Sequence, residues 1–373
     1  AIRHFVESPE GSRFLQSFKT FAASPSFRST NVHGRSFRFE DLLATFLGKV
    51  SDHAATADLP LPRRLIAGRP VAYAGAAPDP ALAETRYDTA FAASGFDEIH
   101  YVYEPVAAAF WFAQGLTRDA TVLVADFGGG TSDFSVVRFT VDADGVRAHP
   151  LSQSGVGIAG DGFDYRIIDR VVSPRLGKHA RYKSWDKWLD VPAHWFTNFA
   201  RWNQLAVMKS PETIRELEKL AASADDPTGL ERLIEMIEDD LGWPLYKAVS
   251  EVKTALSKAE TATLAFHHGS IHIDETVARA DFETWIADDL ARIDEAVEAS
   301  IAASGVTAGE IDKVFLTGGT SFVPAVRRLF VNRFGEARIE TGEQLLSIAY
   351  GLALIGAEED LERWTVRETV RAT

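Results

Sequence analysis

The feature that most constrains this chain is a run of glycines between two apolar segments. Residues 123–137 read LVADFGGGTSDFSVV. An apolar run ends in Asp126, three glycines follow, and Asp133 precedes the next apolar run. Apolar runs bounded by turn residues are typical of strands, so the pattern predicts two strands joined by a tight turn. An ordinary hairpin remains the alternative, although generic turns rarely need three glycines bracketed by acids.

This turn has the composition of a phosphate cradle. Gly128, Gly129 and Gly130 have no Cβ, so they can take positive φ and let backbone N–H groups approach an anion. Thr131 and Ser132 add hydroxyl donors. The flanking carboxylates would repel a bare phosphate, and they are better explained if Mg²⁺ lies between them and the phosphate, usually through water. No Gly-Lys-Ser/Thr follows, so this is not a Walker A loop.

Two further glycine segments carry weaker signals. In FLTGGTSFVPAV a strand is expected to end at Thr317, and Pro324 stands where a first helical turn would begin. Backbone N–H groups there would face a ligand, although a plain strand-to-helix loop has the same pattern. In GVGIAGDGFDYRIID, Gly155, Gly157 and Gly160 match the dinucleotide fingerprint. No second strand ending in an acid follows, so a Rossmann site is not expected.

Composition limits the class of protein. The chain has 373 residues, which is enough for two to three compact units. Hydrophobic residues make up 46% of it, which is enough for a buried core. Strands and helices alternate along the chain, which favours an α/β class. The net charge of −14 without a basic cluster argues against a nucleic-acid partner. No apolar run is long enough for a membrane span, and there is no cysteine, so we expect a soluble, cytoplasmic protein.

Two expectations concern the second half of the chain. Apolar residues from Phe282 to Ile301 recur at steps of three and four, which predicts one amphipathic helix. Residues 163 to about 260 look mostly helical and are rich in tryptophan. We expect the group Trp185, Trp188, Trp195 and Trp202 to pack inside this helical part, with a partner surface as the alternative.

Six segments, taken in order, resemble the nucleotide-binding domain of the seventy-kilodalton heat-shock chaperones, the DnaK-like branch of the actin and sugar-kinase ATPase superfamily. They are YEPVAAAFWFAQG, ADFGGGTSDFSVV, GIAGDGFD, EVKTALSKAET, FLTGGTSFVP and SIAYGLAL. The resemblance implies an α/β, actin-like ATPase fold with two ribonuclease-H-like halves that close over ATP. It implies a first lobe at 1–116, a second lobe at 117–342 with a helical subdomain at about 170–260, and a C-terminal helix at 343–373 that returns to the first lobe.

The resemblance also implies roles for single residues. Asp126 would lie near the Mg²⁺-bound waters and the attacking water, while Glu104 and Asp133 would order the metal-bound waters. Lys19 stands where the family has a lysine aimed at the γ-phosphate. The phosphate cradle would be Gly128, Gly129, Gly130 and Thr131. The nucleoside side and the pocket wall would be formed by Gly160, Asp161, Lys253, Ser257, Gly318, Gly319, Thr320 and Phe322.

The chain departs from the family pattern in several places. The first phosphate hairpin, an acid-x-Gly-Thr-Thr type motif, is absent from this chain. Thr254 and Phe322 stand where the chaperones have two arginines that sandwich adenine, and of these only Phe322 could stack on a base. Leu345 and Leu346 replace an acid. The interdomain linker and peptide-binding domain are also missing, as in divergent bacterial members of the family.

Three hypotheses follow. The first is an ATP-binding domain that binds ATP and Mg²⁺ between two lobes, with slow hydrolysis in the intact protein if the first phosphate hairpin is present there. The second is a non-catalytic nucleotide-sensing or interaction module that is recognised by an unidentified protein partner. The third is a small-molecule kinase of the same superfamily. Retention of Asp126, Thr131, Asp133 and Glu104 favours the first hypothesis, and the missing hairpin favours the second.

Overall fold

The structure is a computed structural model that describes residues 18–32, 34–56, 62–73, 77–113, 115–142, 145–201, 204–205, 208–341 and 346–366. The chain divides into two compact units. Unit 1 comprises residues 1–159, 291–321 and 326–373, and unit 2 comprises residues 160–290 and 322–325. Helices and strands mix in both units, so the α/β class predicted from the sequence is confirmed. The lobe boundaries implied by the resemblance stay a prediction.

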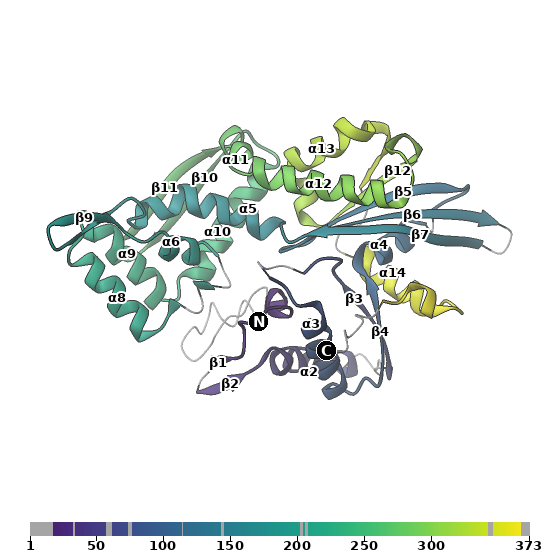
Figure 1. Cartoon of the computed structure of the whole chain (residues 1–373), viewed down its shortest axis with the longest axis horizontal. Coiled ribbons are helices and arrows are strands. Elements are labelled where there is room, and N and C mark those ends of the chain that lie inside the picture. Colours follow the sequence, from purple (N-terminus) through teal and green to yellow (C-terminus); the bar gives the residue numbers. More distant parts are fainter. Residues whose placement is uncertain are drawn as a thin grey trace. The chain divides into compact units, whose positions relative to one another are not determined.

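The largest sheet among the described residues lies in unit 1 and has the strand order β13-β12-β5-β6-β7 (Figure 1). The central strand β5 (Ala120–Phe127) is buried at every residue, as the apolar run at 122–125 predicts, and its burial includes the polar Thr121 and Asp126. It pairs in parallel with β12 (Lys313–Thr317) and antiparallel with β6 (Ser132–Asp142). The outer strands are β7 (Gly145–Val156) and β13 (Ile339–Thr341). The predicted hairpin around the three glycines is therefore confirmed.

Helices cover both faces of this sheet (Figure 1). On one face, α4 (Glu104–Ala113) and α14 (Ser347–Gly356) enclose a core with Val122, Val124 and Val137. On the other face, Phe330 of α13 (Pro324–Phe334) packs against Phe127 and Phe134. Helix α12 (Ala287–Ser304) lies along β7, where the Ser152 and Ser154 hydroxyls donate to its backbone carbonyls.

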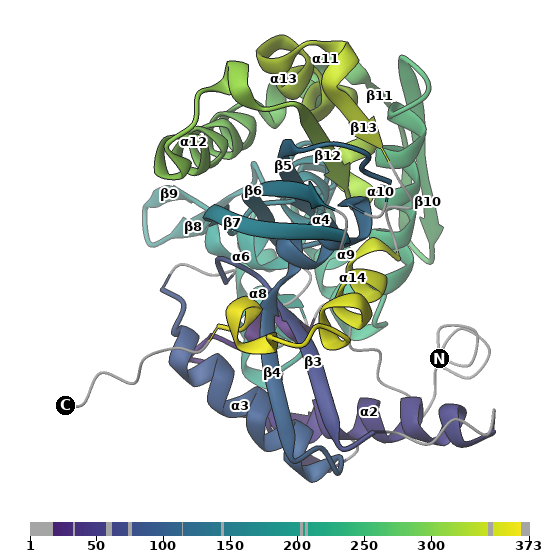
Figure 2. The same cartoon turned by 90° about the vertical axis from the view of Figure 1, so that its right-hand side faces the viewer.

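A second layer of unit 1 forms around a parallel strand pair (Figure 2). Strand β3 (Arg64–Arg69) is followed by α3 (Pro80–Ala93) and β4 (Glu98–Tyr103), and α2 (Phe39–Thr56) packs against the same core. Helix α3 begins where the sequence provides a cap, because the Asp79 carboxylate accepts the Leu82 N–H and Pro80 occupies the first turn.

Short elements complete unit 1. The 3₁₀ helix η1 (Phe18–Phe21) precedes the hairpin of β1 (Thr30–Val32) and β2 (Arg35–Phe37). The remaining 3₁₀ helices are η4 (Ala308–Glu310), η5 (Gly319–Phe322), η6 (Glu336–Arg338) and η7 (Leu361–Trp364). Part of the predicted C-terminal segment, including Leu345, lies outside the described residues.

Unit 2 combines two hairpins with a group of helices. Strands β8 (Arg181–Ser184) and β9 (Lys187–Asp190) form one hairpin, and β10 (Thr261–His268) and β11 (Ile271–Ala278) form the other. The helices are α5 (Gly160–Ile167), the π-helix η2 (Ile168–Val172), the 3₁₀ helix η3 (Ser173–Leu176), α6 (His194–Phe199), α8 (Pro211–Ala221), α9 (Pro227–Glu238), α10 (Gly242–Leu256) and α11 (Arg279–Trp285).

The single amphipathic helix predicted from Phe282 to Ile301 is wrong in one respect. The helix is interrupted at Ile286, where φ is −93° and ψ is 4°, so α11 ends before it and α12 begins after it. Asp288 and Asp289 lie in the first turn of α12. Acids favour a helix start because they face the positive end of the helix dipole.

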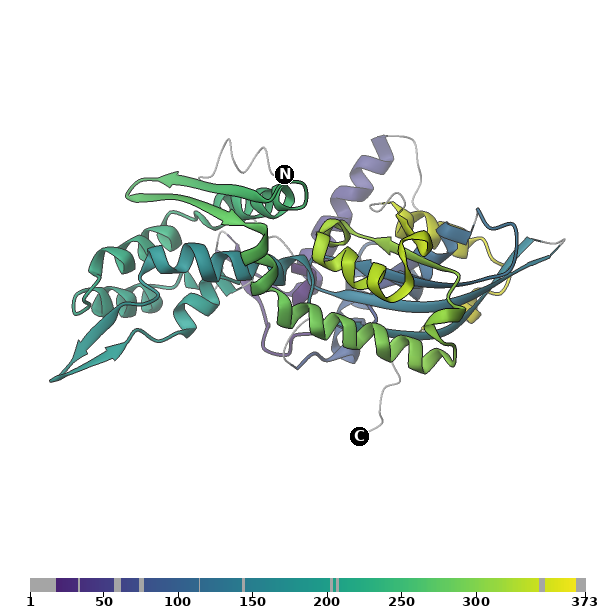
Figure 3. The ribbon, with the colours of Figure 1, turned by 90° about the horizontal axis from the view of Figure 1, so that it is seen from above.

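The tryptophan group is divided. Trp195 is buried, as expected, whereas Trp185 is 94% exposed and Trp188 is 48% exposed, so the core expectation is wrong for these two. Both belong to the β8–β9 hairpin, drawn in teal in Figure 3. A two-residue turn places Trp185 at the tip, where a narrow hairpin offers no neighbouring layer to cover it. Trp202 lies outside the described residues.

Within the described ranges, no helix combines the length and the apolar character that crossing a membrane requires.

We expect Gly351→Ala to destabilise unit 1 by about 3 kcal/mol, because a Cβ at this position would lie 1.7 Å from the Ala107 carbonyl oxygen in the α4–α14 contact. Gly48 in α2 is the matched control. A Cβ there meets no atom within 4 Å, so Gly48→Ala should stabilise the protein by about 0.5–1 kcal/mol through helix propensity. Urea unfolding followed by circular dichroism measures both, and equal stability of Gly351→Ala and wild type would contradict this packing.

Candidate functional site

The glycine hairpin brings two carboxylates side by side. Asp126 and Asp133 are direct partners in the β5–β6 register. Directly opposed residues lie on one face of a sheet with Cβ atoms about 5 Å apart. The turn between them is closed by the Gly128 N–H, which donates to the Thr131 carbonyl at 2.9 Å. Gly128 and Gly129 are exposed, whereas Asp126 is 4% and Asp133 is 1% exposed.

The three turn glycines do not adopt the positive φ angles that glycine permits. Gly128, Gly129 and Gly130 are not among the glycines with positive φ in the described part of the chain. What distinguishes this turn is therefore its lack of Cβ atoms, which leaves its backbone accessible next to two buried acids.

A third carboxylate and a lysine join this pair from the second layer of unit 1. Glu104 is the first residue of α4, directly after β4, and its side chain is 14% exposed. Lys19 of η1 is 54% exposed, and its Nζ lies 2.5 Å from Glu104 Oε1. Partial removal from water lowers the pKa of Lys19, but Glu104, Asp126 and Asp133 outweigh this and raise it above its ordinary value.

The backbone hydrogen bonds to the Asp133 carboxylate fall on one of its two oxygens. Its Oδ1 accepts the Val71 N–H at 2.7 Å and the Ala72 N–H at 3.1 Å, both from the segment after β3. Its Oδ2 is buried and forms no hydrogen bond of ordinary geometry with any described residue. Since buried carboxylate oxygens are normally paired, this atom can accept a hydrogen bond that none of the described residues supplies in ordinary geometry.

Gly155 is a residue of this site that sequence reasoning missed. A Cβ there would lie 2.7 Å from Asp133 Oδ1 and 3.2 Å from the Ala72 backbone nitrogen. The glycine therefore permits the approach of β7 to the carboxylate. In the sequence, Gly155 stood out only as part of the weak dinucleotide fingerprint. It lies in β7, an antiparallel edge strand and not the parallel strand of a dinucleotide-binding unit, so the glycine is explained by close packing. Val71 and Ala72 left no signal, because they act through backbone N–H groups.

Crowding and burial shift both aspartates. Desolvation, followed by the charges of Glu104 and Asp133, raises the pKa of Asp126 to about 8. Desolvation and Glu104 raise the pKa of Asp133 to about 7, although the Thr131 hydroxyl and two backbone N–H groups oppose this. Three carboxylates and one lysine thus form a cluster with a deficit of positive charge. Among the described residues, no three histidine or acid side chains are arranged to hold a metal ion directly.

The second glycine turn lies against the first. Thr317, at the end of β12, pairs with Asp126 in the sheet. Gly318 follows with φ +82°, and a Cβ there would lie 2.0 Å from the Phe127 carbonyl oxygen, so a larger residue does not fit. Thr320 Oγ1 reaches the Gly128 carbonyl at 3.4 Å. Gly319 begins η5. Unit 1 therefore brings together the predicted residues Lys19, Glu104, Asp126, Gly128, Gly129, Gly130, Thr131, Asp133, Gly318, Gly319 and Thr320.

The other predicted residues lie in unit 2. Lys253 Nζ of α10 donates to Asp164 Oδ2 at 2.9 Å and to the Gly160 carbonyl at 3.1 Å, at the start of α5. Asp161 is the next residue of α5. Desolvation raises the pKa of Asp164 to about 6, although the charge and hydrogen bond of Lys253 act against it. Lys253 is thus engaged by its own unit.

Three remaining positions bear on base recognition. Ser257 caps the C-terminus of α10, and its hydroxyl points back to the Lys253 carbonyl at 3.4 Å. The Thr254 hydroxyl donates to the Ser250 carbonyl at 2.8 Å. The Phe322 ring is 61% exposed. Of the two positions that replace the chaperone arginines, only Phe322 presents a face on which a base could stack.

We expect Asp126→Asn to stabilise the nucleotide-free protein at pH 8 by about 1–3 kcal/mol, because it removes a buried group that resists ionisation. The pKa of Asp126 is raised from 3.8 to about 8 on folding, so wild type loses stability as pH rises through this window. The advantage of the variant should therefore shrink toward pH 4. Thermal unfolding between pH 4 and 8 measures it, with the exposed Asp360→Asn as the control that shows no such trend. A variant less stable than wild type at pH 8 would contradict the assignment.

The sequence is similar to that of known proteins of one family. Residues 233–359 match the family model described as Hsp70 protein. The chain is 27% identical over 263 residues to the chaperone protein DnaK of Deinococcus deserti, which covers 70% of this chain and 34% of that protein. It is 24% identical over 261 residues to a chaperone protein dnaK of Cyanidioschyzon merolae, covering 70% and 35%. It is 26% identical over 262 residues to the stromal 70 kDa heat shock-related protein, chloroplastic, of Spinacia oleracea, covering 70% and 35%.

The matched part spans about a third of the length of these curated relatives. The sheet with its helices is compatible with the fold that the resemblance implies. Over the matched residues the chain is thus similar to proteins of the heat-shock protein 70 family, and these matches support a nucleotide-binding domain of that type.

Proposed function

We propose that this chain is an ATP-binding domain of heat-shock-chaperone type, with an actin-like ATPase fold of two lobes, which binds ATP with Mg²⁺ and contributes to slow hydrolysis in the intact protein. One observation carries the proposal. Two buried aspartates flank an exposed glycine turn, with the Lys19–Glu104 pair beside them. A cytoplasmic location stays part of the proposal and rests on the cysteine-free sequence.

The residues at this turn fit a magnesium ion held through water. Asp133 Oδ2 forms no hydrogen bond of ordinary geometry with a described residue, and burial raises the pKa of Asp126 and of Asp133. Both features call for added positive charge. Asp126, Asp133 and Glu104 would accept hydrogen bonds from water molecules around the ion. The ion would neutralise charge on the phosphates, which is its usual role beside nucleotides.

The residues of unit 1 would then act by positioning and charge. Phosphoryl transfer needs little else from a protein, because its transition state is stabilised mainly by alignment and electrostatics. The exposed backbone of Gly129 would donate its N–H group to a phosphate oxygen, while the Gly128 N–H keeps the turn closed. The Lys19 ammonium would face the terminal phosphate, and Asp126 would accept a hydrogen bond from a nearby water.

The residues of unit 2 would serve the nucleoside. Gly160 and Asp161 begin α5, and Lys253 fixes that helix start to α10. In the free protein Lys253 is paired with Asp164, so its expected role is to shape this surface and to offer hydrogen bonds beside the sugar. The exposed Phe322 ring would stack on the base, which is worth roughly 1 kcal/mol and does not discriminate strongly between bases.

Nucleotide binding should require the turn and the support of Asp133. We expect Gly129→Val to weaken binding of ATP with Mg²⁺ at least tenfold, since a β-branched side chain blocks the exposed backbone. Gly155→Ala should weaken it chiefly when Mg²⁺ is present, because its Cβ displaces the Asp133 carboxylate. Calorimetry with and without Mg²⁺ measures both, with Gly48→Ala as the control. Equal affinities of all four proteins would overturn the proposal.

A protein-interaction role is the second candidate, and the exposed hairpin favours it. Trp185, Trp188 and Leu189 are large apolar side chains at 94%, 48% and 43% exposure. Exposed apolar patches on a protein surface often mark sites of interaction with another protein. This surface would serve an unidentified protein partner whose binding responds to the nucleotide.

The hairpin is tested separately from nucleotide binding. We expect Trp185→Ser combined with Trp188→Ser to leave ATP affinity unchanged and to lower stability by less than about 1 kcal/mol, because Trp185 is almost fully exposed and Trp188 loses mainly its contact with the Arg181 guanidinium. Crosslinking of the intact protein in its own cells should then lose a partner that wild type retains. The buried Trp195→Ser serves as the control that lowers stability. Identical crosslinking patterns for wild type and the double variant would remove this candidate.

A further inference from the structure

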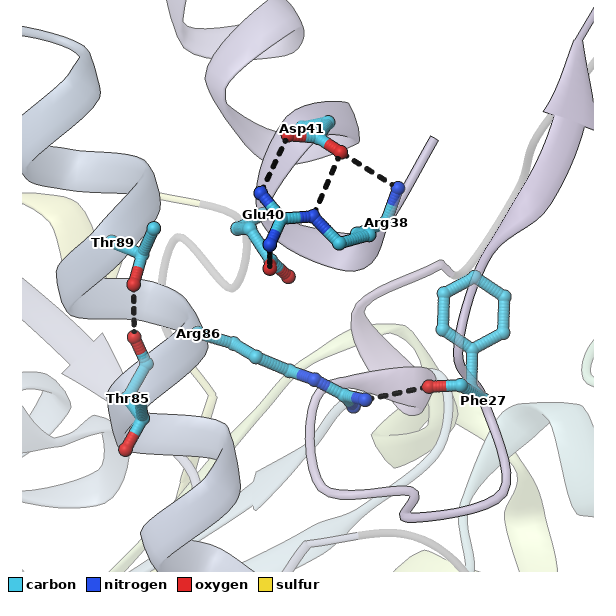
Figure 4. Close-up of polar contacts among 7 residues, drawn as sticks. All are labelled: Phe27, Arg38, Glu40, Asp41, Thr85, Arg86 and Thr89. Carbon is cyan, nitrogen blue, oxygen red and sulfur yellow. Dashed lines mark hydrogen bonds and ion pairs between the residues drawn. The ribbon is translucent and has the colours of Figure 1, made fainter. Parts of the chain in front are cut away.

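A single arginine organises the loop that follows Lys19. Arg86 Nη1 donates to the carbonyls of Phe21, Ala22 and Ser24 at 2.8, 2.8 and 3.1 Å. Its Nη2 donates to the Phe27 carbonyl at 2.6 Å. Figure 4 shows this side chain extending from α3 to the Phe27 carbonyl. Four carbonyls of one loop therefore converge on one guanidinium from a different element.

Holding the Arg86 guanidinium partly away from water is unfavourable, which indicates that its hydrogen bonds serve a specific role. Arg86 is half-buried, and desolvation lowers its pKa, while the charges of Glu40 and Asp79 act in the opposite direction. Its hydrogen bonds given above all go to backbone carbonyls, which a loop otherwise leaves to water. The guanidinium is a rigid, planar fork with five donors, so it holds several acceptors in one geometry.

The loop is short and rigidly connected to Lys19. The Ala22 N–H donates to the Lys19 carbonyl at 3.1 Å, so the first Arg86-bound residues continue the turn that carries the lysine. Ala22 and Ala23 are fully buried, and the Ala23 carbonyl accepts the Asp79 N–H at 2.8 Å. The rings of Phe21 and Phe27 stack at 4.6 Å across the loop.

We propose that Arg86 is a positioning residue for Lys19. By fixing four carbonyls within residues 21–27, it holds η1 so that the Lys19 ammonium reaches Glu104 at the carboxylate cluster. That this also directs the ammonium to the terminal phosphate of ATP rests on the proposed function. Arg86 itself touches neither the cluster nor, by this account, the nucleotide.

The first test needs no nucleotide. A double-mutant cycle of Lys19→Met and Glu104→Gln measures the coupling of the pair as a change in the unfolding equilibrium constant, which we expect to be about threefold for a half-exposed pair. Repeated with Arg86→Met, the cycle should show no coupling. With Arg86→Lys, whose ammonium can hold some of the carbonyls, part of the coupling should return.

Arg338 provides a matched control in the same unit. It is also half-buried, and its Nη1 donates to the carbonyls of Ala308 and Ile311 at 3.1 and 3.0 Å. Arg338→Met should lower stability but leave the Lys19–Glu104 coupling intact. Coupling that survives Arg86→Met, or that is absent from wild type, would overturn the inference. If Arg86→Met fails to fold, the comparison is made with Arg86→Lys.

The second test compares ATP with ADP in the full chain, with Mg²⁺ present. A lysine aimed at the terminal phosphate contributes to ATP binding alone, so Lys19→Met should reduce the ATP-to-ADP affinity ratio about tenfold. Arg86→Met should reduce it similarly, and should add little once Lys19 is already methionine. Arg338→Met should not change the ratio. If Lys19→Met reduces the ATP-to-ADP affinity ratio and Arg86→Met leaves it unchanged, the inference is overturned. If wild type binds neither nucleotide, the proposed function is overturned, and the first test alone decides the role of Arg86.

Discussion

The candidate site depends on the burial of Asp126 and Asp133 as direct cross-strand partners. Two carboxylates in this position repel each other, and removal from water makes their ionised forms costly, so burial raises the pKa of each. A sheet does not place such a pair for stability, because apolar residues would pack there without this cost. The pair is best explained as a binding feature whose unfavourable energy is offset when positive charge arrives.

The surroundings of the pair limit this cost without removing it. Backbone N–H groups after β3 hold one oxygen of Asp133, and the Lys19–Glu104 pair adds one positive and one negative charge. The cluster therefore stays short of positive charge. Lys19 reaches the cluster from η1, and the carbonyls of the loop that follows η1 are bound by Arg86. The position of the one positive charge at the site therefore depends on a residue of α3, a helix that supplies no acid to the cluster.

Close approach of backbones explains the glycines that matter most. Gly318 lies against the Phe127 carbonyl, Gly155 against the Asp133 carboxylate, and Gly351 against the Ala107 carbonyl. Each marks a place where two elements meet at a distance that no side chain permits. The glycines at 128–130 differ, because their turn is exposed to solvent and the absence of side chains leaves the backbone accessible to a ligand. The same residue type thus serves packing in the core and exposure at the site.

The sequence by itself determined the strands and the turn of the glycine hairpin and the carboxylates that flank it. The strand before Asp126 and the β12–α13 turn formed as predicted, because strand burial and turn conformations depend on neighbouring residues. Tertiary structure decided which groups meet. The N–H groups of Val71 and Ala72 and the reach of Arg86 leave no pattern in a sequence, since backbone donors are common to all residues and long-range contacts depend on packing. The exposure of Trp185 was decided in the same way, because a side chain is buried only if the fold brings another layer over it.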